Sequence, residues 1–252
     1  MFFLLDKKRG APAAAAFTPA SISGLTAWYD FSDVSTLFTD SARTTAVTAD
    51  GDAIGGVTDK SGNAAHLSAS TTARPTYKTA IQNSKSIARF NGSANKLNGT
   101  IPTLANSAFS IFLVRKSSYD SGTRVVLTVG VDDVSYKHLH IKQSASGSES
   151  FDLYSYAAGA TGLALNTFAL YRFSQNSSKS LYYHRNGTQV TSNTANASFF
   201  TGTTDFRIGS YGPFDIQWFL GDIGEVLIYT GELSAGNVSS IETYLNARWS
   251  LF

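Results

Sequence analysis

The sequence predicts an all-β fold made of two packed antiparallel sheets. Short apolar segments of strand length recur along the chain, and turn-forming residues separate them. The composition agrees with this prediction, because the 252 residues include 21 glycines and only 15% of them are charged. A chain of this length is compatible with one large β-sandwich. We therefore expect a single sandwich domain whose core is large enough to fold independently.

Residues 1–21 are predicted to form an extended N-terminal arm. An apolar tip is followed by a basic group, and the residues concerned are Phe2, Phe3, Leu4, Leu5, Lys7, Lys8 and Arg9. The apolar run is shorter than that of a signal peptide, and the charges follow it instead of preceding it. We expect the arm to dock on another protein, with residues 2–5 in a groove and the basic residues facing acidic groups.

The strands of the body become clearer along the chain. The domain is predicted to begin near Ile22, and residues 39–63 are expected to form a long polar loop with a short strand at 53–58. The main expected strands are 86–90, 109–114, 125–131, 138–142, 151–155, 168–173, 181–184 and 206–208. Asn186-Gly187 predicts a type I′ hairpin turn, because this turn needs positive φ at both central positions.

The chain is predicted to end as a buried strand and an amphipathic helix. Residues 222–229 contain a near-continuous apolar run, which is typical of a strand covered on both faces. Ser234 is well placed to cap the helix N-terminus. Glu242 is expected to point away from the body. The face that packs on the body is expected to contain Val238, Ile241, Tyr244, Leu245 and Arg248.

Five short motifs occur in a characteristic order. They are WYDFSD at 28–33, DKSGN at 59–63, PTY at 75–77, FNG at 90–92 and GDIGEVLIY at 221–229. In this order they resemble the laminin-G-like (LamG-type) jelly rolls of the concanavalin A-like lectin/glucanase superfamily. The resemblance covers residues 22–252 and implies a two-sheet antiparallel jelly-roll sandwich.

The resemblance implies a fold more than a function, since a fold hosts many functions. Members include sugar-binding modules, glycosidases, adhesins and virion decorations, and such domains are frequent in structural proteins of tailed bacteriophages. Glycosidases of this fold place paired carboxylates around the scissile bond. Here the glutamates Glu149, Glu225, Glu232 and Glu242 are far apart in sequence, so no catalytic residue is predicted. Glu225 is interpreted as a structural carboxylate.

Calcium is a candidate ligand, although no cofactor is required by the sequence. The oxygen-bearing residues that gather in one region are Asp30, Asp33, Asp50, Asp52, Asp59 and Asn63. Calcium takes six to eight oxygen ligands, which such loops can supply. The alternative is that these residues cap turns through the local backbone. His138 and His140 share a strand face and are expected to face solvent, without an evident third metal ligand.

An aromatic loop near residue 214 is the candidate glycan site. Its proposed contacts are Tyr211, Phe214, Asp215, Gln217 and Trp218. Aromatic rings stack on the apolar faces of sugars, and polar neighbours bind the hydroxyl groups. The alternative is that Phe214 and Trp218 belong to the core.

The leading functional hypothesis is a non-enzymatic structural protein of a bacteriophage virion, either a capsid decoration or a head or tail fibre component. Its arm would dock on other virion proteins, and its lectin-like jelly roll would lie on the virion surface, where it could meet host-surface glycans. The alternatives are a carbohydrate-binding adhesin of a bacterial surface and a glycoside hydrolase. Nucleic acid is not expected, because the basic residues are scattered and the net charge is only +2. No membrane partner is expected either, and the sequence leaves open whether the chain forms a homo-oligomer.

Overall fold

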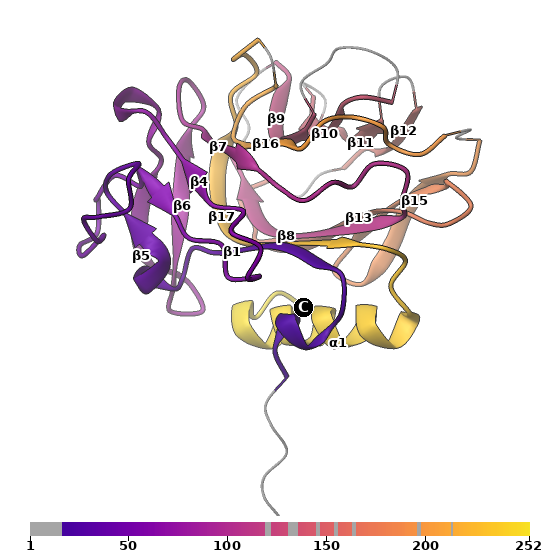
Figure 1. Cartoon of the computed structure of the whole chain (residues 1–252), viewed down its shortest axis with the longest axis horizontal. Coiled ribbons are helices and arrows are strands. Elements are labelled where there is room, and N and C mark those ends of the chain that lie inside the picture. The colour runs from indigo at the N-terminus through magenta and orange to yellow at the C-terminus, as the bar shows by residue number, and fades with distance from the viewer. Residues whose placement is uncertain are drawn as a thin grey trace, which may run out of the picture.

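Two antiparallel β-sheets pack face to face in the computed structural model of this chain, and one helix lies against the outer face of one sheet (Figure 1). The structure describes residues 17–118, 122–130, 136–144, 147–153, 156–162, 165–195, 198–212 and 214–252. The arrangement confirms the predicted two-sheet antiparallel sandwich with a short C-terminal helix.

Sheet A contains eight strands within the described residues. They are β1 (Leu25–Asp30), β5 (Thr76–Gln82), β6 (Lys85–Asn91), β8 (Phe109–Ser117), β13 (Ala169–Gln175), β14 (Leu181–Arg185), β15 (Thr188–Asn193) and β17 (Leu220–Thr230). The order is β15-β14-β13-β8-β17-β6-β5, and β1 also pairs with β17. The long strand β17 therefore has β8 on one side and first β6, then β1, on the other.

Sheet B contains nine strands in the part of the chain that the structure describes. They are β2 (Leu37–Phe38), β3 (Gly56–Val57), β4 (Leu67–Ser68), β7 (Leu97–Thr100), β9 (Arg124–Val129), β10 (Leu139–Gln143), β11 (Glu149–Leu153), β12 (Tyr156–Ala160) and β16 (Asp205–Ile208). The order is β12-β11-β10-β9-β16-β7-β4-β3-β2. Three 3-10 turns, η1 (Pro19–Ser21), η2 (Val34–Thr36) and η3 (Thr71–Ala73), and the helix α1 (Ala235–Trp249) complete the described elements.

Two hydrophobic cores explain the apolar run of β17. Val226 and Ile228 point into the main core between the sheets, whereas Leu227 and Tyr229 point into a second core under α1. Successive residues of a strand face opposite sides of its sheet. Both sides of sheet A are covered here, so positions 226–229 are all apolar, and the predicted cover on both faces of this strand is confirmed.

Local signals at two further places are confirmed. Asn186 and Gly187 have φ values of 48° and 75°, as a type I′ turn between β14 and β15 requires. The Ser234 side chain accepts a hydrogen bond from the backbone N–H of Asn237 at the start of α1. Among the described residues, no helix is long and apolar enough to cross a membrane.

The predicted orientation of Glu242 is wrong. Its carboxylate accepts a hydrogen bond from Arg172 Nε of β13 at 3.0 Å, and its side chain is only 14% exposed. The apolar pattern of α1 could not reveal this contact, because an ion pair with a neighbouring strand leaves no periodic signal in the helix sequence.

The described end of the N-terminal arm packs on the domain itself. The Phe17 ring lies 5.8 Å from the Tyr244 ring of α1, measured between centroids. The hydroxyl of Tyr229 donates a hydrogen bond to the Pro19 carbonyl at 3.0 Å. The predicted docking residues 2–9 lie outside the described residues, so their docking stays a prediction.

Candidate functional site

Five neighbouring strands of sheet B place one polar residue each in a single row. The cross-strand partners from β11 to β7 are Asp152, His140, Thr128, Arg207 and Asn98. Their apolar neighbours along each strand point into the main core. The row therefore lies on the outer face of sheet B, as the alternation of a half-buried antiparallel sheet requires.

The aromatic loop covers one part of this row. The backbone N–H of Gly212 donates to Thr128 Oγ1 at 3.3 Å, and this hydroxyl donates to the Ser210 carbonyl at 3.2 Å. At the other end of the loop, Trp218 pairs with Val125 of β9 in a parallel bridge. The loop is thus attached to the sheet at both ends, and its aromatic residues are held against the row.

The predicted solvent-facing position of the two histidines is wrong. His138 and His140 are stacked, with ring centroids 5.0 Å apart, and they are only 3% and 7% exposed. The Tyr211 ring meets both rings edge-on, at 5.9 and 5.3 Å between centroids. The period-two pattern correctly placed both histidines on one face, but it could not show that a loop covers them.

A small cavity of about 230 Å³ opens where the loop meets β10. Its lining residues are Thr123, His140, Lys142, Tyr211 and Gln217. His140 Nε2 lies 3.1 Å from Asp152 Oδ2, and Lys142 pairs with the same carboxylate. Burial lowers the pKa of His140, and Asp152 opposes this effect only in part. The neutral ring offers one donor and one acceptor.

The tip of the loop is exposed and apolar. Phe214 and Ile216 are 55% and 46% exposed, and the Phe214 ring stacks on Tyr211 at 5.9 Å. Trp218 is half-buried. The structure therefore leaves Phe214 outside the core, and it brings Tyr211, Phe214, Gln217 and Trp218 together in one short loop, as the sequence suggested.

Asp215 acts as a bridge between two cations. One carboxylate oxygen accepts a hydrogen bond from Arg207, and the other accepts one from Lys96, each at 2.5 Å. The Lys96 ammonium group also lies 5.6 Å from the centroid of a Trp218 ring. Neither Lys96 nor Arg207 was predicted, because only the register of β7 and β16 brings them to the loop.

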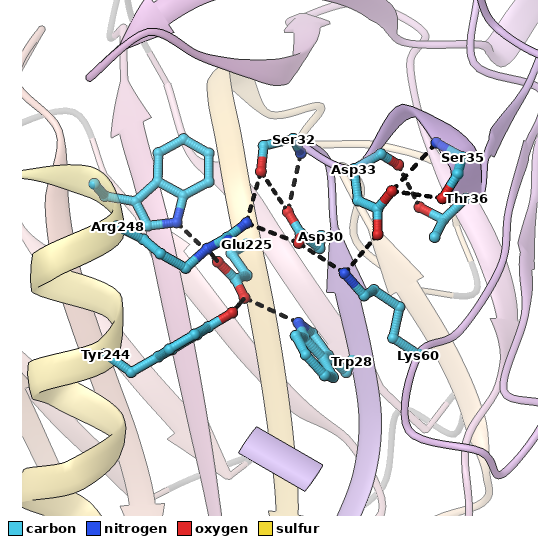
Figure 2. Close-up of polar contacts among 11 residues, drawn as sticks. Trp28, Asp30, Ser32, Asp33, Ser35, Thr36, Lys60, Glu225, Tyr244 and Arg248 are labelled. Carbon is cyan, nitrogen blue, oxygen red and sulfur yellow. Dashed lines mark hydrogen bonds and ion pairs between the residues drawn. The ribbon is translucent and has the colours of Figure 1, made fainter. Parts of the chain in front are cut away.

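The candidate calcium residues do not share one site. Asp30 and Asp33 approach each other, but the Lys60 ammonium group lies between them, at 3.0 and 2.7 Å (Figure 2). Among the described residues, no group of three or more histidines or carboxylates is placed to hold a metal ion. A protein cation thus occupies the position between the two carboxylates.

The other four residues of that set hold turns and loops. Asp50 accepts from the backbone N–H of Thr79, and Asp52 accepts from that of Ala49, both at 2.9 Å. The remaining pair, Asp59 and Asn63, bonds to the backbone of β1, since Asp59 accepts from Trp28 N at 2.9 Å and Asn63 donates to the Leu25 carbonyl at 2.8 Å. The Asp52 contact is a local turn cap, as the alternative interpretation expected, whereas the contacts given for Asp50, Asp59 and Asn63 join segments that are distant in sequence.

A buried polar cluster fastens α1 to sheet A. Glu225 of β17 accepts hydrogen bonds from Trp28 Nε1 at 2.9 Å, Trp249 Nε1 at 2.8 Å and Arg248 Nε at 3.2 Å (Figure 2). Arg248 also donates to Asp30 at 2.8 Å. Burial raises the pKa of Glu225 to about 7, Asp30 adds to this effect, and Arg248 opposes it.

The two carboxylates of this cluster are close together but are not arranged as a glycosidase pair. Asp30 and Glu225 are each 1% exposed, and α1 covers them. A glycosidase needs its carboxylates in an open cleft that admits the scissile bond. The cluster therefore fits the structural role that the sequence suggested for Glu225, with partners that the sequence did not reveal.

In sequence comparisons, no family model and no curated protein matches this chain. Solved structures do match its fold. A Trypanosoma rangeli sialidase has a TM-score of 0.62 at 12% identity, covering 89% of this chain and 34% of that one. The ligand-binding domain of botulinum neurotoxin serotype D has a TM-score of 0.57 at 11% identity, covering 75% and 48%. The NanB sialidase of Streptococcus pneumoniae has a TM-score of 0.50 at 13% identity, covering 61% and 27%.

This chain thus spans less than half the length of each of these proteins. At such low identity the comparisons show a shared fold and no more. They agree with the lectin-like β-sandwich that the motifs at 28–33 and 221–229 implied.

Proposed function

We propose that this chain is a carbohydrate-binding module whose sugar site is formed by the aromatic loop on the outer face of sheet B. The observation that carries the proposal is the exposed Phe214, which stacks on Tyr211 beside the cavity at His140. Aromatic rings pack against the apolar faces of sugars, and a few polar groups fix the orientation of the ligand.

The cavity supplies the polar groups that such a site needs. Thr123 and Gln217 lie on its lining, and both can exchange hydrogen bonds with sugar hydroxyls. His140 Nδ1 is buried and has no hydrogen-bond partner among the described residues. A buried polar atom normally has a partner, so a ligand hydroxyl at this nitrogen would complete its hydrogen bonding.

The backbone of the loop also supports a binding role. Asp215 and Gln217 have φ values of 48° and 57°, in the left-handed region that non-glycine residues rarely adopt. Such conformations persist only where surrounding contacts impose them, and they cluster at ligand sites. Here the Asp215 side chain is held by Lys96 and Arg207.

The charges around the loop favour an acidic sugar. Among the described residues, the three cations Lys96, Arg207 and Lys142 pair with two carboxylates, those of Asp152 and Asp215. The surplus of positive charge would attract a carboxylate. Two proteins of similar fold were solved with such ligands, the neurotoxin domain with N-acetylneuraminic acid and the trypanosomal sialidase with 2,3-difluorosialic acid. Sialylated glycans are therefore the first ligands to test.

The test is a glycan-binding screen followed by calorimetry with wild-type protein and the variant Phe214→Ala. Phe252→Ala is the matched control, because Phe252 is 58% exposed and lies at the end of α1, away from sheet B. We expect Phe214→Ala to weaken binding about tenfold or more, and the control to bind like wild type. Wild-type protein that binds no glycan, or equal binding by Phe214→Ala, would refute the proposal.

The display of this module on a phage virion is a further part of the proposal, and it rests on the sequence alone. Its support is the apolar and basic arm of residues 2–9 and the family resemblance. The alternative, an adhesin of a bacterial surface, would use the same sugar site. Incorporation of full-length and truncated chains into particles separates these two hypotheses.

A further inference from the structure

A second cavity lies on the opposite side of the sandwich, on the outer face of sheet A. Its volume is about 280 Å³, near the lower limit of the ~300–1,000 Å³ range of ligand pockets. Strands β8, β13, β14 and β15 form its floor. Leu233 and Val238, at the start of α1, form one wall. α1 lies along this face of the sheet in Figure 1.

The floor of this cavity is polar, although the same sheet face is apolar under α1. One cross-strand row contains Ser110, Ser174 and Tyr182, and the next contains Arg172, His184 and Gln189. All six residues line the cavity. Solubility alone would explain polar residues on an exposed sheet face. It would not explain why these polar residues gather around one cavity.

Several of these polar groups are buried. Ser110 and Ser174 are 5% and 8% exposed, and Gln175 beside them is 1% exposed. His184 Nδ1 is buried and has no hydrogen-bond partner in the described part of the chain. Burial lowers the pKa of His184 to about 4, and the nearby Arg172 adds to this effect. The imidazole is therefore neutral at pH 7 and offers one donor and one acceptor.

The charged groups of the cavity already have partners in the protein. Arg172 Nε donates to Glu242 at 3.0 Å, and Glu232 accepts a hydrogen bond from the backbone N–H of Ser177 at 2.9 Å. An anionic ligand would have to displace Glu242 from Arg172, and a cationic ligand would compete for Glu232 with the Ser177 N–H group. The cavity therefore suits an uncharged ligand.

We infer that this cavity is a second binding site, which takes a neutral polyhydroxylated group such as one uncharged sugar residue. Sugar hydroxyls both donate and accept hydrogen bonds, and so do the serine hydroxyls, the Gln189 amide and the neutral His184 ring. The Tyr182 ring adds an aromatic surface for the apolar face of a sugar. This inference does not depend on the site at the aromatic loop, because the two sites lie on opposite sheets.

The experiment is an NMR titration of the uniformly ¹⁵N-labelled full chain, and of a second sample labelled at histidine, with neutral hexoses and N-acetylhexosamines at millimolar concentration. We expect the His184 ring signals to shift on saturation, together with the amide signals of Tyr182 and Gln189. Gln189 is exposed, so Gln189→Ala should fold normally. Because Gln189→Ala lacks the side-chain amide, we expect it to bind the sugar about tenfold more weakly than wild type. His184→Ala is a second variant that should also bind more weakly.

Two outcomes would overturn the inference. One is that no neutral sugar shifts these signals at saturating concentration. The other is that both variants bind like wild type. Phe214→Ala should leave this binding intact, and Gln189→Ala should leave binding at the aromatic loop intact. A negative binding result at one proposed site therefore does not affect the conclusion about the other site.

Discussion

Trp28 and Trp249 donate their indole N–H groups to opposite oxygens of one buried carboxylate, at 2.9 and 2.8 Å. Trp28 lies in the first strand and Trp249 at the end of the last helix, whereas the carboxylate belongs to Glu225 of the central strand β17. This contact joins the two ends of the domain through its middle (Figure 2 shows Trp28, Glu225 and Arg248).

Replacing this carboxylate by an apolar group of similar size should strongly destabilise the fold. In Glu225→Leu, both indoles and Arg248 lose a buried acceptor, and removal of one partner of a buried pair costs about 3–5 kcal/mol. Urea unfolding measures the loss. The comparison is Glu232→Leu, at an exposed carboxylate that accepts one hydrogen bond from the Ser177 backbone, which should change the free energy of unfolding by about 1 kcal/mol. Equal effects of the two substitutions would show that the cluster contributes nothing.

The stability of the wild-type protein should depend on the ionisation of Glu225. Its pKa is raised from an ordinary value of 4.5 to about 7, chiefly by burial. Between these pH values the folded state binds more protons than the unfolded state, so the free energy of unfolding falls as pH rises through this window. The contribution is complete below pH 4.5 and lost above pH 7.

The variant Glu225→Gln isolates this effect, because its amide does not titrate. We expect the difference in free energy of unfolding, wild type minus variant, to be smaller at pH 8 than at pH 5. Measurements at both pH values by chemical unfolding check the sign. A difference that grew with pH would mean that the folded protein prefers the ionised carboxylate, and a constant difference would mean that folding leaves the pKa of Glu225 unchanged.

The sequence predicted those parts of the fold that depend on local patterns. The alternation in 109–114, the apolar run at 222–229, the Asn186-Gly187 turn and the Ser234 cap all leave a periodic or chemical signal in neighbouring residues, and the structure confirms each one. The pairing of β1 and β6 with the same edge of β17 left no such signal, because strand order depends on contacts distant in sequence.

In the candidate site too, local features could be predicted from the sequence, whereas contacts between distant residues could not. The aromatic loop could be identified from its composition, but the polar row beneath it could not, since Asp152, Thr128 and Arg207 come together only through the register of β11, β9 and β16. Likewise the acidic residues at 30 and 33 resembled metal ligands, because nothing in their spacing reveals that Lys60 lies between them.

Calcium is expected to have no effect on thermal stability. Lys60 and Arg248 together compensate the charges of Asp30 and Asp33, so a divalent ion would have to displace a protein cation. A ligand that binds only the folded state raises the melting temperature. Melting curves with millimolar calcium and with a chelator should therefore coincide. A rise with calcium would contradict this expectation, and loss of that rise in Asp33→Asn would locate the ion at this pair.

Truncation of the arm should separate stability from docking. The described contacts of the N-terminal region begin at Phe17 and Pro19, which touch Tyr244 and Tyr229. Deletion of residues 1–16 removes none of these contacts, so the free energy of unfolding should change by less than about 0.5 kcal/mol. Deletion of residues 1–19 removes both and should destabilise the domain by about 1–3 kcal/mol.

The same shorter truncation tests the docking hypothesis. If residues 2–5 occupy an apolar groove on another virion protein, the chain lacking residues 1–16 should fold but fail to join particles, as measured by cosedimentation. The variant with Lys7, Lys8 and Arg9 replaced by serine serves as an intermediate case, because it keeps the apolar anchor and loses only the charge contacts. Incorporation of the wild-type chain should strengthen as salt is lowered, because surface charge attraction grows as screening falls. Incorporation of this variant should change less with salt. Normal incorporation of the truncated chain would show that the arm does not anchor the domain.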